Sequence, residues 1–290
     1  MTIMKKDNQR NGVLIEVSQG QLHQTYYPTC FFDVDSCITQ HEGIDELGRI
    51  HGKIESVAAL TKQAMEGVLP FDEVFGKRLE LIQPRVTDFA LISDMYLRHH
   101  IKDARDVFYV LQSVGVTIHL LSGGFDAAIM PLAEYLGIPQ DCVHANTLFF
   151  DERGKYRGYD SQNVLSRKRG KKLAIDALLQ TKKIHGPVAI VGDAVSELET
   201  ATATDLRIGF GGFVQRKPVM EGADVYLPEP TFAPLIPLFL DRQRINELLH
   251  KKNTHQQALR NGFKKMNHVR FNVRARELKL AIATITSQLL

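Results

Sequence analysis

Two aspartates with one residue between them, Asp33 and Asp35, are the first feature of this sequence that could do chemistry. They stand at the end of an apolar segment, Thr29 to Val34, which has the composition of a buried β-strand. Alternate residues of a strand point to the same face, so both carboxylates would meet where the carboxyl ends of parallel strands open a crevice. Burying two like charges is costly unless a cation or a proton compensates them. The pair therefore predicts a nucleophile and an acid/base partner around Mg²⁺, which prefers carboxylates and phosphate oxygens; the alternative is a surface turn in which the aspartates only cap a helix.

A second segment offers an anion site. Ser122, Gly123 and Gly124 directly follow a β-branched and leucine-rich segment, 116–121, and precede a helix expected over 126–136. A Ser-Gly-Gly turn that opens a helix presents backbone N–H groups, a hydroxyl and the positive end of the helix dipole. We expect these three residues to bind an anionic group, the alternative being an ordinary strand-to-helix turn.

A second pair of acids follows another buried strand. Val188 to Val191 is apolar and leads into Asp193, and Glu197 comes four residues later in the first turn of an expected helix. Because open α/β sheets bind ligands at the carboxyl ends of their strands, the two acid pairs and the anion site would converge there. The sequence thus predicts one site that combines carboxylates, a metal ion and an anionic substrate.

The order of these features resembles that of the haloacid dehalogenase superfamily and, within it, of the phosphoserine phosphatase family. The shared motifs are Asp33-x-Asp35, Ser122-Gly123-Gly124, a basic segment and Gly192-Asp193-x-x-x-Glu197. Further likeness, specific to the smaller family, lies in His41 to Leu47, Met65, Pro70-Phe71, Lys77 to Pro84 and Gly209 to Val214. The resemblance covers roughly residues 28 to 240. It implies an α/β fold with a Rossmann-like parallel-sheet core, an inserted helical cap and a C-terminal helical extension.

The sequence departs from the family pattern at three places. Cys37 stands where the first motif usually has Thr, and Glu197 stands where the fourth motif more often has Asp. The third motif is ambiguous because segment 166–172 is rich in cations. We favour Lys171, since it best reproduces a loop lysine that opens an amphipathic helix. The alternatives in the same segment are Lys168 and Arg169.

The resemblance also implies a role for each residue of the site. Asp33 would attack phosphorus and form an aspartyl-phosphate, while Asp35 would protonate the leaving oxygen and later take a proton from water. Lys171 would complete the catalytic set by keeping Asp33 ionised. Mg²⁺ would be held by Asp33, the backbone carbonyl of Asp35 and Asp193, with Glu197 behind them or acting through water. The phosphoryl oxygens would bind to Ser122, Gly123 and Gly124.

Substrate specificity is expected to come from the cap. Glu42 can pair with a substrate ammonium, and Arg78 can hold a carboxylate in a two-pronged grip. Met65 and Phe71 would cover a short carbon frame and exclude water. Without the resemblance these four would be taken as structural residues: a charge near a helix start, a solvated arginine and two core side chains. The resemblance favours a small phosphorylated amino acid as their ligand.

The implied activity is Mg²⁺-dependent hydrolysis of O-phospho-L-serine to L-serine and phosphate, a reaction of serine biosynthesis. One alternative keeps the machinery but acts on another small phosphomonoester, or transfers the phosphoryl group to an acceptor alcohol. A second alternative makes the chain a nucleic-acid-binding protein with a basic tail. The scarcity of aromatic residues in that tail and the complete set of catalytic acids argue against it.

The expected elements divide the chain into four parts. Residues 1–26 are a polar N-terminal arm, and residues 41–100 are a helical cap. Residues 27–40 and 101–240 form the catalytic α/β core, where strands alternate with helices. Residues 241–290 form a basic helical extension. The elements expected in detail are cap helices over 42–51, 54–66, 71–83 and 87–99, a helix over 103–113, and a hairpin of 143–151 with 155–159.

Charge and cysteine content indicate the cellular compartment in which the chain is expected. The formal net charge of +3 divides into +8 for residues 241–290 and −5 for the remainder. The three cysteines argue against a disulfide scaffold and for a reducing compartment. No apolar stretch reaches the ~20 residues that a membrane helix needs, and the N-terminus lacks the apolar core of a signal peptide. The cytoplasm is therefore the expected location.

The last helix of the extension carries one apolar stripe, formed by Leu278, Ile282, Ile285 and Leu289. We expect this stripe to pack on its own domain. A homodimer contact is the first alternative, and contact with nucleic acid or a membrane surface is the second.

Overall fold

The computed structural model describes residues 25–65 and 71–289, so the predicted arm over 1–26 lies almost entirely outside the described residues. Its centre is a seven-stranded sheet in the order β3-β2-β1-β6-β7-β8-β9, in which only β9 pairs antiparallel. The strands are β1 (Thr29–Phe32), β2 (Thr117–Phe125), β3 (Val143–Asn146), β6 (Val188–Gly192), β7 (Leu206–Phe210), β8 (Val225–Leu227) and β9 (Arg270–Phe271). The predicted α/β class with a mostly parallel sheet is confirmed.

Strand β1 lies inside this sheet, between β2 and β6, because all four of its residues are apolar enough, or small enough, to be buried. Its two phenylalanines point to opposite faces, as the two-residue period of a strand requires. Phe32 packs against Phe108 with 4.7 Å between ring centroids, whereas Phe31 joins a separate apolar cluster with Ile175. Helices therefore cover both faces of the sheet. They are α5 (Ala104–Gln112), α6 (Asp126–Tyr135), α7 (Gly170–Gln180), α8 (Val195–Leu198), α9 (Lys217–Gly222) and α10 (Leu235–Phe239).

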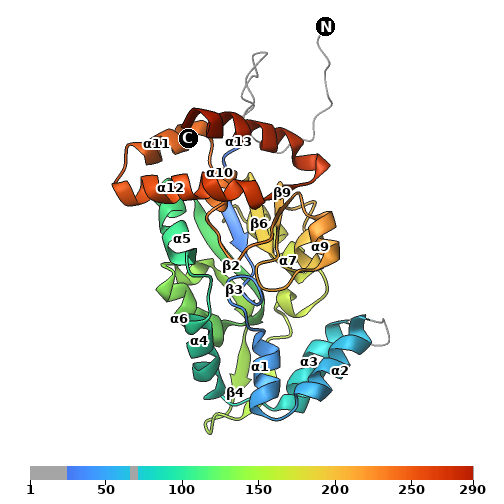
Figure 1. Cartoon of the computed structure of the whole chain (residues 1–290). Helices are drawn as coiled ribbons and strands as arrows, with labels where there is room; N and C mark the ends of the chain where they lie inside the picture. The colour runs from blue at the N-terminus through green and yellow to red at the C-terminus, as the bar shows by residue number, and fades with distance from the viewer. Residues whose placement is uncertain (1–24, 66–70, 290) are drawn as a thin grey trace.

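A group of helices is inserted between β1 and β2, and Figure 1 shows it at the end of the sheet opposite the C-terminal helices. Its members are α1 (Gly43–Ile50), α2 (Ile54–Met65), α3 (Phe71–Ile82) and α4 (Asp88–Arg98), each within a residue or two of the expected run. Thr39 and His100 form an antiparallel bridge where the chain enters and leaves this group. We propose residues 41–100 as the bounds of the cap, since this bridge ties its two ends together.

The expected hairpin is partly wrong. Only β4 (Leu148–Phe150) and β5 (Tyr156–Tyr159) pair with each other. Residues 143–146 instead lie parallel to β2 as an edge of the main sheet, where Val143 sits opposite Leu120. The small β4–β5 sheet meets the cap, because Tyr159 packs against Phe75 of α3 with 5.0 Å between ring centroids.

The C-terminal extension is a structural part of the core. Its helices α11 (Arg242–Leu249), α12 (Asn253–Lys265) and α13 (Arg276–Leu289) lie at the top of Figure 1, and β9 adds an edge strand beside β8. Ile282 and Ile285 of the predicted stripe are buried in the main apolar cluster, and Leu278 packs against it. The side chain of Leu289 lies outside the described residues. The stripe thus packs on its own domain, as expected.

Short 3₁₀ turns complete the described part of the chain: η1 (Gln140–Cys142), η2 (Val164–Ser166), η3 (Met266–His268) and η4 (Val273–Ala275). None of the helices in the described part of the chain is long and apolar enough to span a membrane.

This packing predicts that the extension stabilises the whole domain. Phe263 of α12 is 1% exposed and belongs to the same apolar cluster as β1. We expect Phe263→Ala to lower the free energy of unfolding by about 3–5 kcal/mol, through lost transfer energy and a cavity. Val273, which is 85% exposed, provides the control, and Val273→Ala should stay within about 0.5 kcal/mol of wild type. Urea denaturation followed by circular dichroism measures both, and equal stability of the two variants would contradict the shared core.

Candidate active site

The carboxyl ends of three neighbouring strands bring the predicted residues together. Asp33 follows β1, Ser122 lies in β2, and Asp193 follows β6, while the sheet order places β1 between the other two strands. These ends form the floor of a cavity of about 400 Å³. The cap closes its other side through Ile44 of α1 and Phe75 and Arg78 of α3. The site is therefore a pocket between core and cap.

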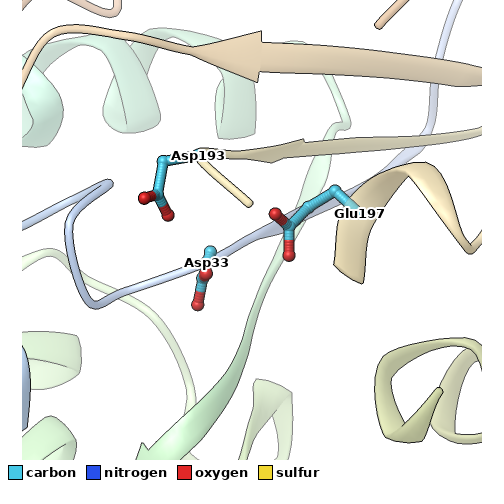
Figure 2. A group of neighbouring side chains, drawn as sticks. All are labelled: Asp33, Asp193 and Glu197. Carbon is cyan, nitrogen blue, oxygen red and sulfur yellow. The ribbon is translucent and has the colours of Figure 1, made fainter. Parts of the chain in front are cut away.

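Three carboxylates meet on the floor of this pocket. Asp33, Asp193 and Glu197 each offer an oxygen, and these oxygens all lie within 4.8 Å of one another. Figure 2 shows the three side chains as neighbours. Their exposed fractions are 7%, 2% and 1%. Glu197 turns inward from the first turn of α8, where its Oε2 accepts the Ala194 N–H at 2.8 Å. Such a set of buried, hard oxygen donors fits a divalent cation of the Mg²⁺ type.

Gly192 gives Glu197 the space that this position requires. A Cβ on residue 192 would lie 2.5 Å from the Glu197 carboxyl carbon, closer than van der Waals contact allows. The absence of a side chain at the end of β6 is thus a condition for the carboxylate cluster.

Among the predicted cations of segment 166–172, Lys171 is the one that contacts Asp33 and Glu197 of this cluster. Its ammonium lies 2.6 Å from Asp33 Oδ2 and 2.5 Å from Glu197 Oε1. Burial lowers the pKa of Lys171, but the two carboxylates outweigh that effect and hold the pKa above its usual range. The alternatives Lys168 and Arg169 have exposed side chains on the pocket rim. Among the three predicted candidates, the geometry favours Lys171.

A tight turn before α7 carries Lys171 inward. Arg169 adopts a left-handed conformation with φ of 58°, and Gly170 follows it. A Cβ on Gly170 would lie 2.3 Å from the Val164 carbonyl oxygen, so only glycine allows the helix to start so close to η2. The basic segment therefore turns Lys171 to the floor of the pocket and leaves Lys168 and Arg169 exposed on its rim.

Burial sets the ionisation of the acids in this pocket. It raises the pKa of Asp33, the neighbouring Glu197 and Asp193 carboxylates raise it further, and the Lys171 ammonium opposes them. Burial and Glu197 also raise the pKa of Asp193, against the effect of Arg216. A cation near these acids would lower their pKa values and hold them ionised.

Arg216 is a pocket residue that sequence reasoning missed. Its guanidinium lies 2.9 Å from Asp193 Oδ2 and 4.0 Å from Glu42 Oε1. It sits just before α9, two residues after the stretch Gly209 to Val214 that carries part of the family likeness. Its position next to that stretch was the only sequence signal for a role of Arg216. Its contact with Asp193 depends on the fold.

Asp35 lies beside the carboxylate cluster and is held from the cap. The Tyr96 hydroxyl donates to its Oδ1 at 2.5 Å, and the Gly43 N–H donates to its Oδ2 at 3.1 Å. Burial raises the pKa of Asp35 to about 6, although both hydrogen bonds act to lower it. Such a carboxyl can hold or release a proton near neutral pH, as an acid/base partner must. Tyr96 had no role in the sequence-based prediction.

The predicted Ser-Gly-Gly turn is wrong in detail. Strand β2 continues through this segment to Phe125, and its pairing with β3 becomes irregular between Leu121 and Phe125. Ser122 is buried, and its Oγ accepts the Gly124 N–H at 2.9 Å. All three predicted residues line the pocket, at an irregular strand end followed by α6.

The structure describes the side chains of two of the four predicted specificity residues, Glu42 and Arg78. Glu42 Oε1 accepts the Ser36 hydroxyl at 2.6 Å, and burial, together with nearby Asp35, raises the pKa of Glu42 to about 7. Arg78 is half-buried in α3 and donates to Thr61 at 3.3 Å. Its buried Nε has no hydrogen-bond partner among the described residues, which leaves a donor for an anionic ligand. Met65 ends α2 and Phe71 begins α3, but their side chains lie outside the described residues.

Comparison with known proteins places this chain in a family. The profile of the haloacid dehalogenase-like hydrolases matches residues 27–205. The phosphoserine phosphatase of Drosophila melanogaster is 37% identical over 201 residues, which are 68% of this chain and 73% of that protein. The phosphoserine phosphatase of Homo sapiens is 34% identical over 215 residues, which are 73% of this chain and 95% of that protein. A solved structure described as a phospho-aspartyl intermediate analogue of phosphoserine phosphatase superposes with a TM-score of 0.59 at 26% identity, covering 73% of this chain and 98% of its own.

Proposed function

The chain belongs to the haloacid dehalogenase-like hydrolases, and we propose that it hydrolyses O-phospho-L-serine to L-serine and phosphate through an aspartyl-phosphate on Asp33. The observation that carries this proposal is the buried cluster of Asp33, Asp193 and Glu197 with Lys171 in contact, beside Ser122 at the end of the next strand. A phosphomonoester dianion needs positive charge and N–H donors around its oxygens, and this pocket supplies both.

Asp33 is the proposed nucleophile. Its carboxylate oxygen forms a bond to phosphorus while the bond from phosphorus to the serine oxygen breaks. Lys171 keeps the attacking carboxylate ionised, since it contacts Oδ2 at 2.6 Å. Asp33, Asp193 and the backbone carbonyl of Asp35 would hold Mg²⁺, which supplies positive charge against the phosphate dianion when it is bound. Glu197 would support this arrangement from its contact with Lys171.

Asp35 is the proposed acid and base. It gives its proton to the serine oxygen as that oxygen leaves phosphorus. In the second half of the reaction it takes a proton from water, whose oxygen bonds to phosphorus as the Asp33 bond breaks. Ser122, Gly123 and Gly124 would bind the oxygens of the phosphoryl group during both transfers.

Glu42 and Arg78 are proposed to select the substrate. Phosphoserine carries an ammonium and a carboxylate besides its phosphate, so a selective pocket needs one anion and one cation on its far side. Both residues line the pocket on the cap side, and the buried Nε of Arg78 has no partner among the described residues. Met65 and Phe71 are proposed to cover the carbon frame.

A panel of small phosphomonoesters, assayed for phosphate release with and without Mg²⁺, tests the function. We expect wild type to prefer phosphoserine and to lose activity when Mg²⁺ is chelated. Arg78→Ala and Glu42→Gln should each raise KM for phosphoserine about 30-fold, or about 2 kcal/mol, because each removes one partner of a desolvated charge pair. Neither should change KM for p-nitrophenyl phosphate, which has no ammonium or carboxylate. Equal effects of these substitutions on both compounds would refute phosphoserine as the specific substrate. The chain would then be interpreted as a general phosphatase.

We also propose the cytoplasm as the place of action. Cys30, Cys37 and Cys142 are all free and buried, which suits a reducing compartment. Burial raises the pKa of Cys37 well above its usual range, which disfavours the reactive thiolate at this position next to the site. A homodimer stays a prediction, to be tested by light scattering.

A further inference from the structure

Both oxygens of the Asp35 carboxylate are held by residues of the cap. Tyr96 of α4 donates its hydroxyl to Oδ1 at 2.5 Å, and Gly43 at the start of α1 donates its N–H to Oδ2 at 3.1 Å. Asp35 itself belongs to the core segment that follows β1 and is 9% exposed. The side chain thus crosses from core to cap, and its orientation depends on cap residues.

Two glycines make room for this arrangement. A Cβ on Gly43 would lie 2.7 Å from the Tyr96 hydroxyl oxygen, and a Cβ on Gly124 would lie 2.9 Å from Asp35 Oδ2. The second contact shows that Oδ2 is the oxygen turned towards the phosphate-binding segment. With Oδ1 engaged by the hydroxyl, Oδ2 accepts only the longer bond from the Gly43 N–H and is the oxygen that faces the substrate.

We propose that Tyr96 is a positioning residue for the reaction, and that its hydroxyl fixes the Asp35 carboxylate so that Oδ2 can exchange a proton with the leaving group and with water. This inference rests on the proposed function, in which Asp35 is the acid and base. Tyr96 has no exposed surface, so water does not replace the hydroxyl as a donor. An ordinary tyrosine keeps its proton at neutral pH, so it acts here as a fixed donor and not as a second acid. Loss of the hydroxyl frees the carboxylate to rotate away from the leaving oxygen.

A purely structural role for Tyr96 makes a different prediction. Its ring belongs to the apolar cluster of the domain, and removal of the whole side chain would disturb the fold. Tyr96→Phe keeps the ring and removes only the hydroxyl. The two roles then separate by leaving group, because serine must be protonated as it leaves whereas p-nitrophenolate leaves as a stable anion.

The experiment compares the first chemical step for both compounds in single-turnover and burst measurements. We expect Tyr96→Phe to slow the release of serine from phosphoserine by about tenfold, the size of one lost positioning contact, with KM nearly unchanged. The burst of p-nitrophenolate should stay within about twofold of wild type, since that step needs no proton donor. Equal slowing of both bursts, or no slowing of either, would overturn the role of Tyr96.

Two further variants complete the design. Tyr226→Phe is the matched control, because Tyr226 is 2% exposed and its buried hydroxyl has no hydrogen-bond partner among the described residues. It should leave both bursts at the wild-type rate. Gly43→Ala displaces the Tyr96 hydroxyl without removing it and should reproduce the slow release of serine, which keeps the test decisive if Tyr96→Phe folds poorly. Normal release of serine by Gly43→Ala would count against the proposal.

The same data separate this inference from the proposed function. Asp35→Asn should slow the release of serine more than Tyr96→Phe does and should spare the p-nitrophenolate burst. A wild type that releases no serine, or an Asp35→Asn variant as fast as wild type, would overturn the function itself. An active wild type with an impaired Asp35→Asn variant and a normal Tyr96→Phe variant would overturn only the role of Tyr96.

Discussion

Asp33→Asn is expected to abolish turnover, with a loss of at least ~10³-fold in kcat. An amide neither attacks phosphorus nor balances the charge of Lys171 and a bound cation. Asparagine has nearly the same volume as aspartate, so the buried position should tolerate it. The fold should persist, because the change removes one of three carboxylates that crowd within 4.8 Å. Phosphate release from phosphoserine measures the loss, and circular dichroism with thermal melting verifies the fold.

Trapping of the intermediate makes this prediction sharper. Wild type quenched in acid during turnover should carry acid-stable, alkali-labile phosphate on residue 33, and Asp33→Asn should carry none. Asp176→Asn is the control, since Asp176 pairs with Lys172 on α7, outside the pocket, and should retain wild-type turnover. Activity of Asp33→Asn within about tenfold of wild type would rule out the nucleophile, because tenfold is only ~1.4 kcal/mol of barrier.

Much of the fold could be predicted because its signals are local. The apolar runs at β1, β2 and β6 are short, buried and followed by polar residues, which is the pattern of parallel strands with a site at their carboxyl ends. The helices of the inserted group have apolar periods and helix breakers whose effects act within a few residues. The family profile and the relatives confirm the predicted class, family and activity. The assignment of individual residues to roles stays a prediction.

The errors concern properties that the local pattern does not determine. Ser122 to Gly124 contains the glycines of a turn, but pairing with β3 extends the strand through it. The predicted hairpin joined residues 143–146 to the wrong partner, because an apolar segment next to a turn does not specify which strand it will pair with. In both cases the deciding contact lies in a neighbouring strand of the main sheet.

The residues that sequence reasoning missed act across long separations. Tyr96 reaches Asp35 from α4, 61 positions along the chain, and Arg216 reaches Asp193 over 23 positions. Neither residue is part of a recognisable sequence motif. From the sequence alone, Tyr96 would be interpreted as a core residue and Arg216 as a surface residue. Lys171 is the opposite case: the sequence limited the choice to three cations, and its contacts with Asp33 and Glu197 favour one.

Lys171→Ala is expected to cause the second large loss, at least ~10³-fold in kcat, because it removes the cation that holds the nucleophile ionised. Asp33 and Glu197 would then lose their shared ammonium partner, while Asp193 would keep its contact with Arg216. Truncating one member of a buried ion pair typically costs about 3–5 kcal/mol, so the free energy of unfolding should fall by about that amount in the absence of a metal. Phosphate release and urea denaturation measure the two effects.

The neighbouring cations provide matched controls for Lys171. Lys168→Ala and Arg169→Ala remove the same charge from the same segment, but their exposed side chains lie on the pocket rim. Exposed charge pairs contribute only about 0–1 kcal/mol, so both variants should keep the stability of wild type and most of its kcat. If Arg169→Ala were the inactive variant and Lys171→Ala only mildly impaired, the choice of Lys171 as the cation that serves the phosphate would be wrong. The contacts of Lys171 with Asp33 and Glu197 would then describe a structural ion pair beneath the reacting group.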